Sequence, residues 1–134
     1  MNLELLRRVQ AKLRRMHHGG HLDMASFARK TDCGTAYCIG GYALLMAGYK
    51  TKTVKDQKYL DWLAPDGRQL SWSDDGPNSI WGSAQKILGL TEEQANRLFI
   101  DDLWPDEFND QWQLNDPKVA ADRIQHFIDT RGRE

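Results

Sequence analysis

Apolar residues near the start of the chain recur at steps of three and four residues, the spacing of one face of an α-helix. The members of this stripe are Leu3, Leu6, Val9, Leu13 and Met16. Arginines occupy the opposite face, so the pattern predicts an amphipathic helix with a basic, solvated side. The pair Gly19-Gly20 ends this helix, because glycine readily adopts the left-handed conformation that terminates helices.

The next apolar segment, residues 38–47, is rich in small side chains. It predicts a second helix that begins near Thr35, with Thr35 or Asp32 as its N-cap. The adjacent Gly40 and Gly41 cost such a helix about 2 kcal/mol relative to alanine. That cost is offset only if another segment packs closely against them, so we expect this helix to be the most buried one.

Residues 50–79 have the least regular pattern and are interpreted as a variable insert. Within it, Pro65-Asp66-Gly67 is typical of a tight turn, because proline fixes φ and glycine accepts positive φ. Aromatic and apolar residues on either side favour a β-hairpin with arms near 59–63 and 68–72. A helix from Val54 to Leu63 is the alternative.

Helical patterns return after this insert. Ser79 opens a helix that Gly89 stops, and Thr91 with Gln94 forms a capping box for the helix that follows. The short connection between these two helices predicts a tight helix–helix corner.

The last part of the chain is interrupted at Trp104-Pro105. Beyond it, Asn115 or Asp116 caps a final helix that has Pro117 at its first position. Residues 131–134 follow that helix and are predicted to be a frayed tail.

Together these elements predict a mainly α fold in which residues 1–134 form a single helical domain. We expect a bundle of about five or six helices with a small β-hairpin near residues 59–72. The composition agrees with a folded soluble domain, since 40% of the residues are hydrophobic and 28% are charged.

The formal net charge is −1, from 18 basic and 19 acidic side chains. This balance argues against a nucleic-acid-binding or membrane-binding protein. No long apolar stretch follows the first basic residues, so we expect no signal peptide, a cytoplasmic location and reduced thiols.

The charges are nevertheless unevenly distributed along the chain. Basic residues crowd the first predicted helix at Arg7, Arg8, Lys12, Arg14 and Arg15. Acidic residues gather towards the end at Asp101, Asp102, Asp106, Glu107, Asp110, Asp116 and Asp122. We interpret both groups as solvated faces, and the arginines also as candidate contacts for a partner.

Three pieces of the chain, taken in order, resemble a family of small bacterial and phage proteins marked by a C-G-T-x-x-C-(I/L)-x-G-x-A segment. The pieces are residues 22–27, the segment from Cys33 to Ala43, and the helical residues 84–99 followed by Trp104-Pro105. The resemblance covers most of the chain outside residues 50–79. It implies a bacterial or phage origin and no particular activity.

The two cysteines, Cys33 and Cys38, carry the main candidate chemistry. With His17 and His21 they would complete a tetrahedral zinc site, although their spacing is not that of a zinc knuckle. A disulfide is another alternative, without the C-x-x-C spacing of oxidoreductases. We favour a third interpretation, in which the thiols are small buried hydrophobic groups, as free cysteines usually are.

The chain holds five tryptophans, and two of them, Trp62 and Trp72, flank the predicted turn together with Tyr59. In a hairpin these rings would stand on one exposed face, where aromatic side chains commonly anchor protein interfaces. The alternative is that they fold over the helical core.

No phosphate-binding loop, calcium-binding loop or nucleophile motif accompanies these residues. We therefore expect a protein without catalytic activity or cofactor that binds another protein, with a second copy of the chain as an alternative partner. The candidate contact residues are Tyr59, Trp62, Trp72, Arg7, Arg8, Arg14 and Arg15. The resemblance adds the narrower hypothesis of a regulator, such as an inhibitor of a host or rival system.

The competing hypothesis is a thiol- or zinc-dependent protein. Its candidate residues are Cys33, Cys38, His17 and His21.

Overall fold

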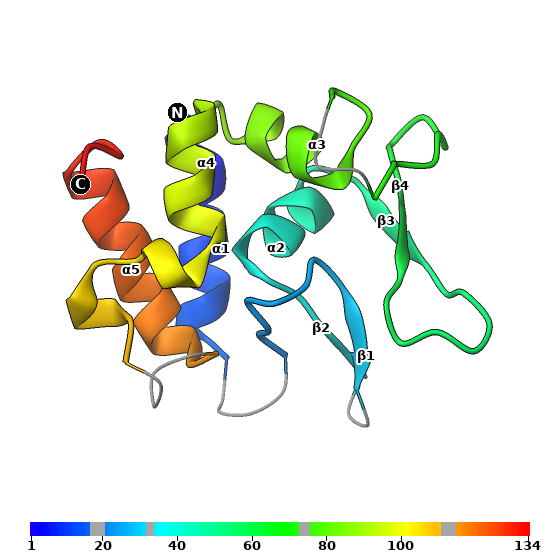
Figure 1. Ribbon diagram of the computed structural model, residues 1–134, viewed down its shortest axis with the longest axis horizontal. Helices are drawn as coiled ribbons and strands as arrows, with labels where there is room; N and C mark the ends of the chain where they lie inside the picture. Colours follow the sequence, from blue (N-terminus) through cyan, green and yellow to red (C-terminus); the bar gives the residue numbers. More distant parts are fainter. Residues whose placement is uncertain (17–20, 32–33, 73–75, 111–114) are drawn as a thin grey trace.

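The computed structural model describes residues 1–16, 21–31, 34–72, 76–110 and 115–134. Within these ranges the chain forms five α-helices, two 3-10 helices and two small antiparallel sheets (Figure 1). The α-helices are α1 (Leu3–Arg14), α2 (Ile39–Met46), α3 (Ile80–Ile87), α4 (Glu92–Phe99) and α5 (Pro117–Asp129). The prediction of a mainly helical chain with a small β element is confirmed, whereas its arrangement as a bundle stays a prediction.

Helices α1 and α5 pack against each other, although they stand at opposite ends of the described chain. Leu6, Val9 and Leu13 of the predicted stripe are fully buried, as the helical spacing requires. The side chain of Gln10 is also buried, and it donates to the Ala121 carbonyl oxygen at 3.2 Å. Leu3, in the first turn, is 47% exposed and lies outside this buried face.

Asn2 joins the start of α1 to the end of α3. Its side-chain oxygen accepts from the Leu5 N–H at 3.1 Å, and its amide nitrogen donates to the Ile87 carbonyl at 3.0 Å. One side chain thus satisfies a free donor of one helix and a free acceptor of another.

Helix α2 begins later than the sequence predicts, at Ile39 and with Cys38 as its N-cap. The residue expected to cap it, Thr35, lies instead in strand β2 (Gly34–Ala36), which pairs with β1 (Arg29–Thr31). A β-branched residue fits a strand well, and the ladder of backbone hydrogen bonds competes with helix formation here. The other expected cap, Asp32, lies outside the described residues.

The two glycines of α2 lie against the segment that contains Phe27. A Cβ atom at Gly41 would overlap the Phe27 carbonyl oxygen, and one at Gly40 would lie 2.6 Å from Cε1 of the Phe27 ring. All residues from Ile39 to Leu44 are buried. The expectation that close packing compensates for the glycine pair is therefore confirmed.

The insert contains strands β3 (Lys50–Lys52) and β4 (Asp61–Leu63), which pair with each other. The predicted turn at residues 65–67 is also present, because Leu63 forms a bridge with Gln69. The predicted second arm, residues 68–72, is not a strand, and β3 takes its place as the sheet partner of β4. The helix considered for residues 54–63 is not formed. The insert also contributes to the buried core, through Leu60, Trp62, Ala64 and Leu70.

Helices α3 and α4 meet at a corner around Gly89, whose φ of +64° suits glycine. Ser79 caps α3 with a hydrogen bond of 2.8 Å from the Gly82 N–H. Thr91 and Gln94 form the predicted capping box at the start of α4. The 3-10 helices η1 (Asp101–Leu103) and η2 (Asp106–Phe108) then lead towards α5.

Residues 131–134 are not frayed, contrary to the sequence-based prediction. Arg123 of α5 is fully buried, and its guanidinium group forms an ion pair with Glu134. The same group donates to the Arg97 carbonyl at 3.1 Å, while Arg97 donates to the Gly132 carbonyl at 2.9 Å. A buried guanidinium needs a counter-charge, and the C-terminal segment supplies it.

Burial lowers the pKa of Arg123, and the hydrogen bond with Glu134 opposes that effect. Arginine remains charged even so. Among the described helices, none is long and apolar enough to cross a membrane.

We predict that Gly41→Ala destabilises the protein by roughly 3 kcal/mol, because the new methyl group meets backbone that cannot rotate away. Gly40→Ala is the matched control, since it brings the same gain in helix propensity but meets the edge of the Phe27 ring instead of backbone, so its loss of stability should be smaller. Urea unfolding of the two variants measures the difference. Equal stabilities for both variants would contradict the packing described for α2.

Glu134→Gln is predicted to lower the free energy of unfolding by about 3 kcal/mol, because it leaves the Arg123 charge buried without its counter-ion. The double variant Arg123→Met with Glu134→Gln should recover most of that loss. Chemical unfolding of both proteins is the measurement. A Glu134→Gln protein as stable as the parent would show that the ion pair contributes nothing.

Candidate functional site

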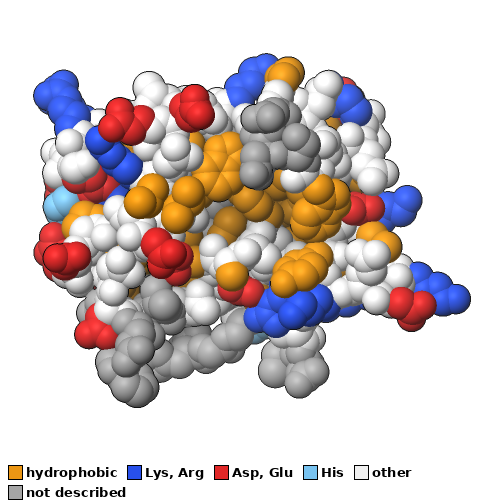
Figure 2. All heavy atoms as spheres, in the orientation of Figure 1, with side chains coloured by type: hydrophobic (Ala, Val, Ile, Leu, Met, Phe, Trp, Pro, Cys, Tyr) orange, Lys and Arg blue, Asp and Glu red, His pale blue; other side chains and the backbone are white. Residues whose placement is uncertain are grey.

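One face of the molecule gathers exposed and half-exposed hydrophobic side chains, and Figure 2 shows them as a broad patch across its centre. We call this the Trp81 surface. It consists of Phe27, Tyr59, Trp72, Trp81 and Ile100, together with the buried Phe99 ring that packs against Phe27 and Trp81. These residues come from four separate segments of the chain, so only the fold brings them together.

The aromatic rings of this surface form two groups. Phe27, Trp81 and Phe99 contact one another edge to face, with ring centroids 5.1 to 6.2 Å apart. Tyr59 and Trp72 form a second edge-to-face pair at 6.4 Å. Such geometry is the preferred arrangement of aromatic pairs, and it fixes the position of each ring.

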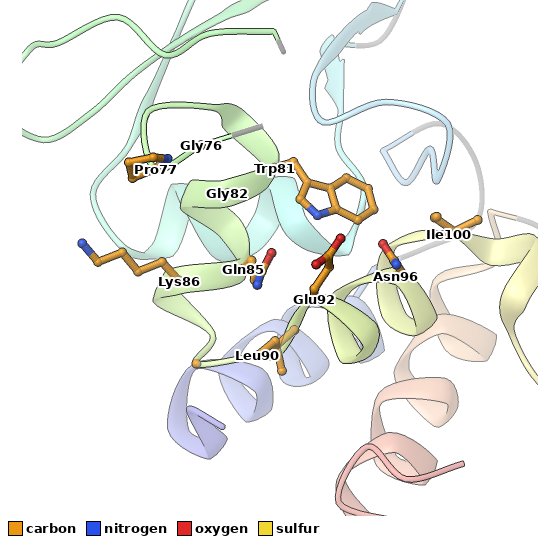
Figure 3. A pocket seen from close by; sticks show the side chains of 11 residues that line it. Gly76, Pro77, Trp81, Gly82, Gln85, Lys86, Leu90, Glu92, Asn96 and Ile100 are labelled. Atoms are coloured by element: carbon orange, nitrogen blue, oxygen red, sulfur yellow. The ribbon is translucent and has the colours of Figure 1, made fainter. Parts of the chain in front are cut away.

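Three depressions open on the Trp81 surface, and Trp81 lines all of them. The largest, of about 580 Å³, is the groove between α3 and α4 (Figure 3). The second, of about 280 Å³, lies between Trp81 and the Tyr59–Trp72 pair. The third, of about 220 Å³, includes Phe27, Phe99 and Asp101 in its lining. Trp81 is therefore the centre of one continuous hollowed surface.

Polar groups line the groove between α3 and α4. Glu92 and Asn96 of α4 and Gln85 of α3 lie near the Trp81 ring, whereas Lys86 lies towards the outer end (Figure 3). An apolar wall with a few convergent polar groups is typical of a binding groove.

Asp101 supplies a carboxylate beside the aromatic rings. Burial raises the pKa of Asp101, and the neighbouring charge of Asp102 raises it further. A cation placed in this depression would therefore relieve an existing electrostatic cost.

The exposed pair at the other end of the surface is also held in place. The Trp72 indole N–H donates to the Asp61 carboxylate at 2.8 Å, and Trp72 is 54% exposed. Tyr59 is 40% exposed, with the Lys58 ammonium 5.3 Å from its ring centroid. The prediction that Tyr59 and Trp72 share an exposed face agrees with this geometry.

Trp62 was predicted to be a contact residue together with Tyr59 and Trp72, and that prediction is wrong. Its side chain is fully buried in the core, 6.0 Å from the Tyr37 ring between centroids. Trp62 is the middle residue of β4, so it points to the face that packs on the helices. It therefore supports the fold and is not available as a contact residue.

The arginines of α1 occupy the solvent face of that helix, as predicted. Arg7, Arg8, Arg14 and Arg15 are exposed, and Arg14 lies 4.0 Å from the Asp122 carboxylate. No α1 residue is among the described linings of the three depressions. The fold thus separates the two groups of contact residues that the sequence proposed together.

Cys38 is buried, and its sulfur accepts a hydrogen bond from the Gly41 N–H at 3.4 Å as the cap of α2. Burial raises its pKa to about 12. A thiol with so high a pKa is a poor nucleophile and a poor metal ligand, because both roles need the thiolate. Its position agrees with the small buried hydrophobic group that we favoured.

Of the other members of the proposed zinc or disulfide site, the structure describes His21. Cys33 and His17 lie outside the described residues. His21 is exposed, and its ring nitrogen lies 3.4 Å from the Thr35 carbonyl oxygen. Where the structure describes the chain, no three His, Cys, Asp or Glu side chains are placed to hold a metal ion.

Sequence reasoning missed Phe27, Trp81 and Asp101 as members of a site. Trp81 falls among the apolar positions of α3, which predicts a core or rim residue and not a member of a site. The ring stays accessible because α3 and α4 leave a groove between them, which Trp81 lines. No local pattern in the sequence could have signalled this position.

No family model matches this chain, and no curated protein or solved structure matches it significantly.

We predict that Cys38, tested in a Cys33→Ser background, does not react with DTNB at about pH 8 unless denaturant is added, because almost no thiolate is present in the folded state. Fast native reaction would contradict the burial described here.

The raised pKa also predicts the direction of a pH effect. As pH rises, the unfolded chain loses the Cys38 proton at a lower pH than the folded protein does. The thiol's contribution to stability is therefore complete below the ordinary cysteine pKa and is lost as pH rises towards 12. The free energy of unfolding should fall by up to about 1.4 kcal/mol per pH unit in that range. A Cys38→Ala variant, which lacks the thiol, should show a smaller fall in urea unfolding between the same pH values.

Proposed function

We propose that this protein is a non-catalytic binding module that engages another protein through the Trp81 surface. The observation that supports this most is the joining of three depressions around one tryptophan ring. Large contiguous apolar patches on protein surfaces commonly mark interaction sites. Tryptophan and tyrosine are also among the residues that dominate the energy of protein interfaces.

The arrangement of the surface fits an interface better than a small-molecule site. Its aromatic rings are spread over three open depressions and do not enclose a single cavity. Polar side chains such as Gln85 and Asn96 border the apolar area, as in interfaces with an apolar centre and a polar rim. Edge-to-face packing holds the rings in place before binding, which reduces the entropy lost on association.

The narrower role of a regulator or inhibitor of a host or rival system, of bacterial or phage origin, is supported by the sequence resemblance alone. It is compatible with a rigid protein whose main surface feature is a binding patch. The α1 arginines remain a second candidate contact area for the same partner, on a different part of the surface.

Panning a random peptide library displayed on phage against the protein tests this proposal. We expect enriched clones whose binding falls at least about tenfold on Trp81→Ala and on Trp72→Ser, because both remove aromatic anchors from the surface. Trp72→Ser provides a second test in case Trp81→Ala fails to fold, because the Trp72 side chain is already half exposed and its loss should disturb the fold less.

Arg8→Ala and Arg15→Ala are the controls, since these side chains are exposed on α1 and line none of the three depressions. Clones that depend on the arginines and not on Trp72 or Trp81 would move the binding site to α1. Failure to enrich any clone that depends on the aromatic residues would overturn the proposal.

A further inference from the structure

The depression of about 220 Å³ beside Trp81 combines aromatic walls with one acidic group. Phe27, Trp81 and Phe99 line it, and their three ring centroids are within 6.2 Å of one another in each pair. Asp101 is the only charged side chain among its described lining residues. Aromatic rings attract cations through their quadrupoles, and a carboxylate adds direct charge attraction.

The size of this depression limits what it can accept. Pockets that hold whole drug-sized ligands are usually larger than about 300 Å³. A depression of about 220 Å³ suits the end of a single side chain. It is also continuous with the groove between α3 and α4 through Trp81 and Ile100, so a peptide that filled the groove could place one side chain in the depression.

The charges around the depression favour a cationic side chain. Asp102 follows Asp101 in η1 and adds a second negative charge, and Glu92 lines the adjoining groove. No basic side chain is among the described lining residues of the depression. Arg29 is paired with Asp23 at 2.6 Å, and Lys86 lies at the outer end of the adjoining groove (Figure 3).

We propose that the Trp81 surface recognises a partner protein through a lysine or arginine side chain, which enters the depression lined by Phe27, Trp81 and Phe99 and pairs with Asp101. This inference rests on the protein-binding function proposed above. It adds the chemistry of the partner: a segment with an apolar anchor for the groove and a basic residue beside it.

A second copy of this chain fits the site less well, although its α1 helix is basic. The exposed face of α1 carries arginines, Lys12 and Ala11, but beyond Leu3 it offers no large apolar side chain to fill the groove. Arg14 is in addition within 4.0 Å of Asp122. The basic helix of a second copy thus lacks the apolar anchor that the groove requires, and the proposed occupant is a different protein.

Peptides selected on the Trp81 surface provide the test. For each enriched sequence, a synthetic peptide is compared with a twin in which arginine is replaced by citrulline, or lysine by norleucine, and affinities are measured by calorimetry. We expect the selected peptides to share a basic residue next to an apolar one, and the neutral twin to bind about tenfold more weakly.

Asp101→Asn should weaken the binding of the basic peptide by a similar factor and should leave the affinity of the neutral twin unchanged. The effects of the two changes on binding free energy are therefore not additive. Asp102→Asn is the matched control. It removes the same charge one residue away, from a side chain that is not among the described lining residues, and should have the smaller effect.

The outcomes separate this inference from the proposed function. Peptides that depend on Trp81 but not on the basic residue or on Asp101 would leave protein binding intact and overturn the cationic site. Peptides that do not depend on Trp81 would overturn both. Concentration-dependent dimerisation of the protein alone, abolished by Asp101→Asn, would show that the occupant is a second copy and would overturn the inference that it is a different protein.

Discussion

The close approach of the Phe27 backbone to Gly41 is the contact on which the rest of the structure depends. It places residues 22–28 directly on the most buried helix, and the Cys38 N–H then donates to the Ser26 carbonyl at 3.0 Å. The Phe27 ring is thereby carried to within contact of Trp81 and Phe99. A side chain at position 41 would push this segment away from α2, so the same glycine supports both the core and the aromatic surface.

A second constraint holds the acidic side of that surface. The Trp104 indole N–H donates to the Leu98 carbonyl at 3.0 Å, and the Trp104 backbone N–H donates to the Asp101 carbonyl at 3.0 Å. The guanidinium of Arg123 lies 5.8 Å from the Trp104 ring centroid and is in turn paired with Glu134. The C-terminal segment therefore helps to fix the turn that carries Asp101, although it lies well away from the groove in the sequence.

The insert contains two tryptophans, Trp62 and Trp72, that have different roles in the structure. Trp62 is fully buried, whereas Trp72 is 54% exposed. The pleat of β4 turns Trp62 towards the core, and the bridge between Leu63 and Gln69 reverses the chain after it. Trp72 then lies beyond the paired region, where its ring rests on Tyr59 and its N–H is satisfied by Asp61. Composition alone treats the two tryptophans as equivalent.

The sequence by itself determined the helices with a strong period or clear caps. The stripe of α1 and the capping box at Thr91 could be read from local spacing, because each depends on residues within one element. The glycine pair of α2 indicated that something packs closely there, but only the structure shows that it is Phe27. It did not determine strand β2, the ordered C-terminal segment or the burial of Trp62. Strand β2 is decided by the competition between pairing with β1 and helix formation. The C-terminal segment and Trp62 depend on partners in other elements, such as Arg97 for the Gly132 carbonyl and Tyr37 for the Trp62 ring. The Trp81 surface belongs to the second kind, because its rings come from four segments that only tertiary packing brings within contact.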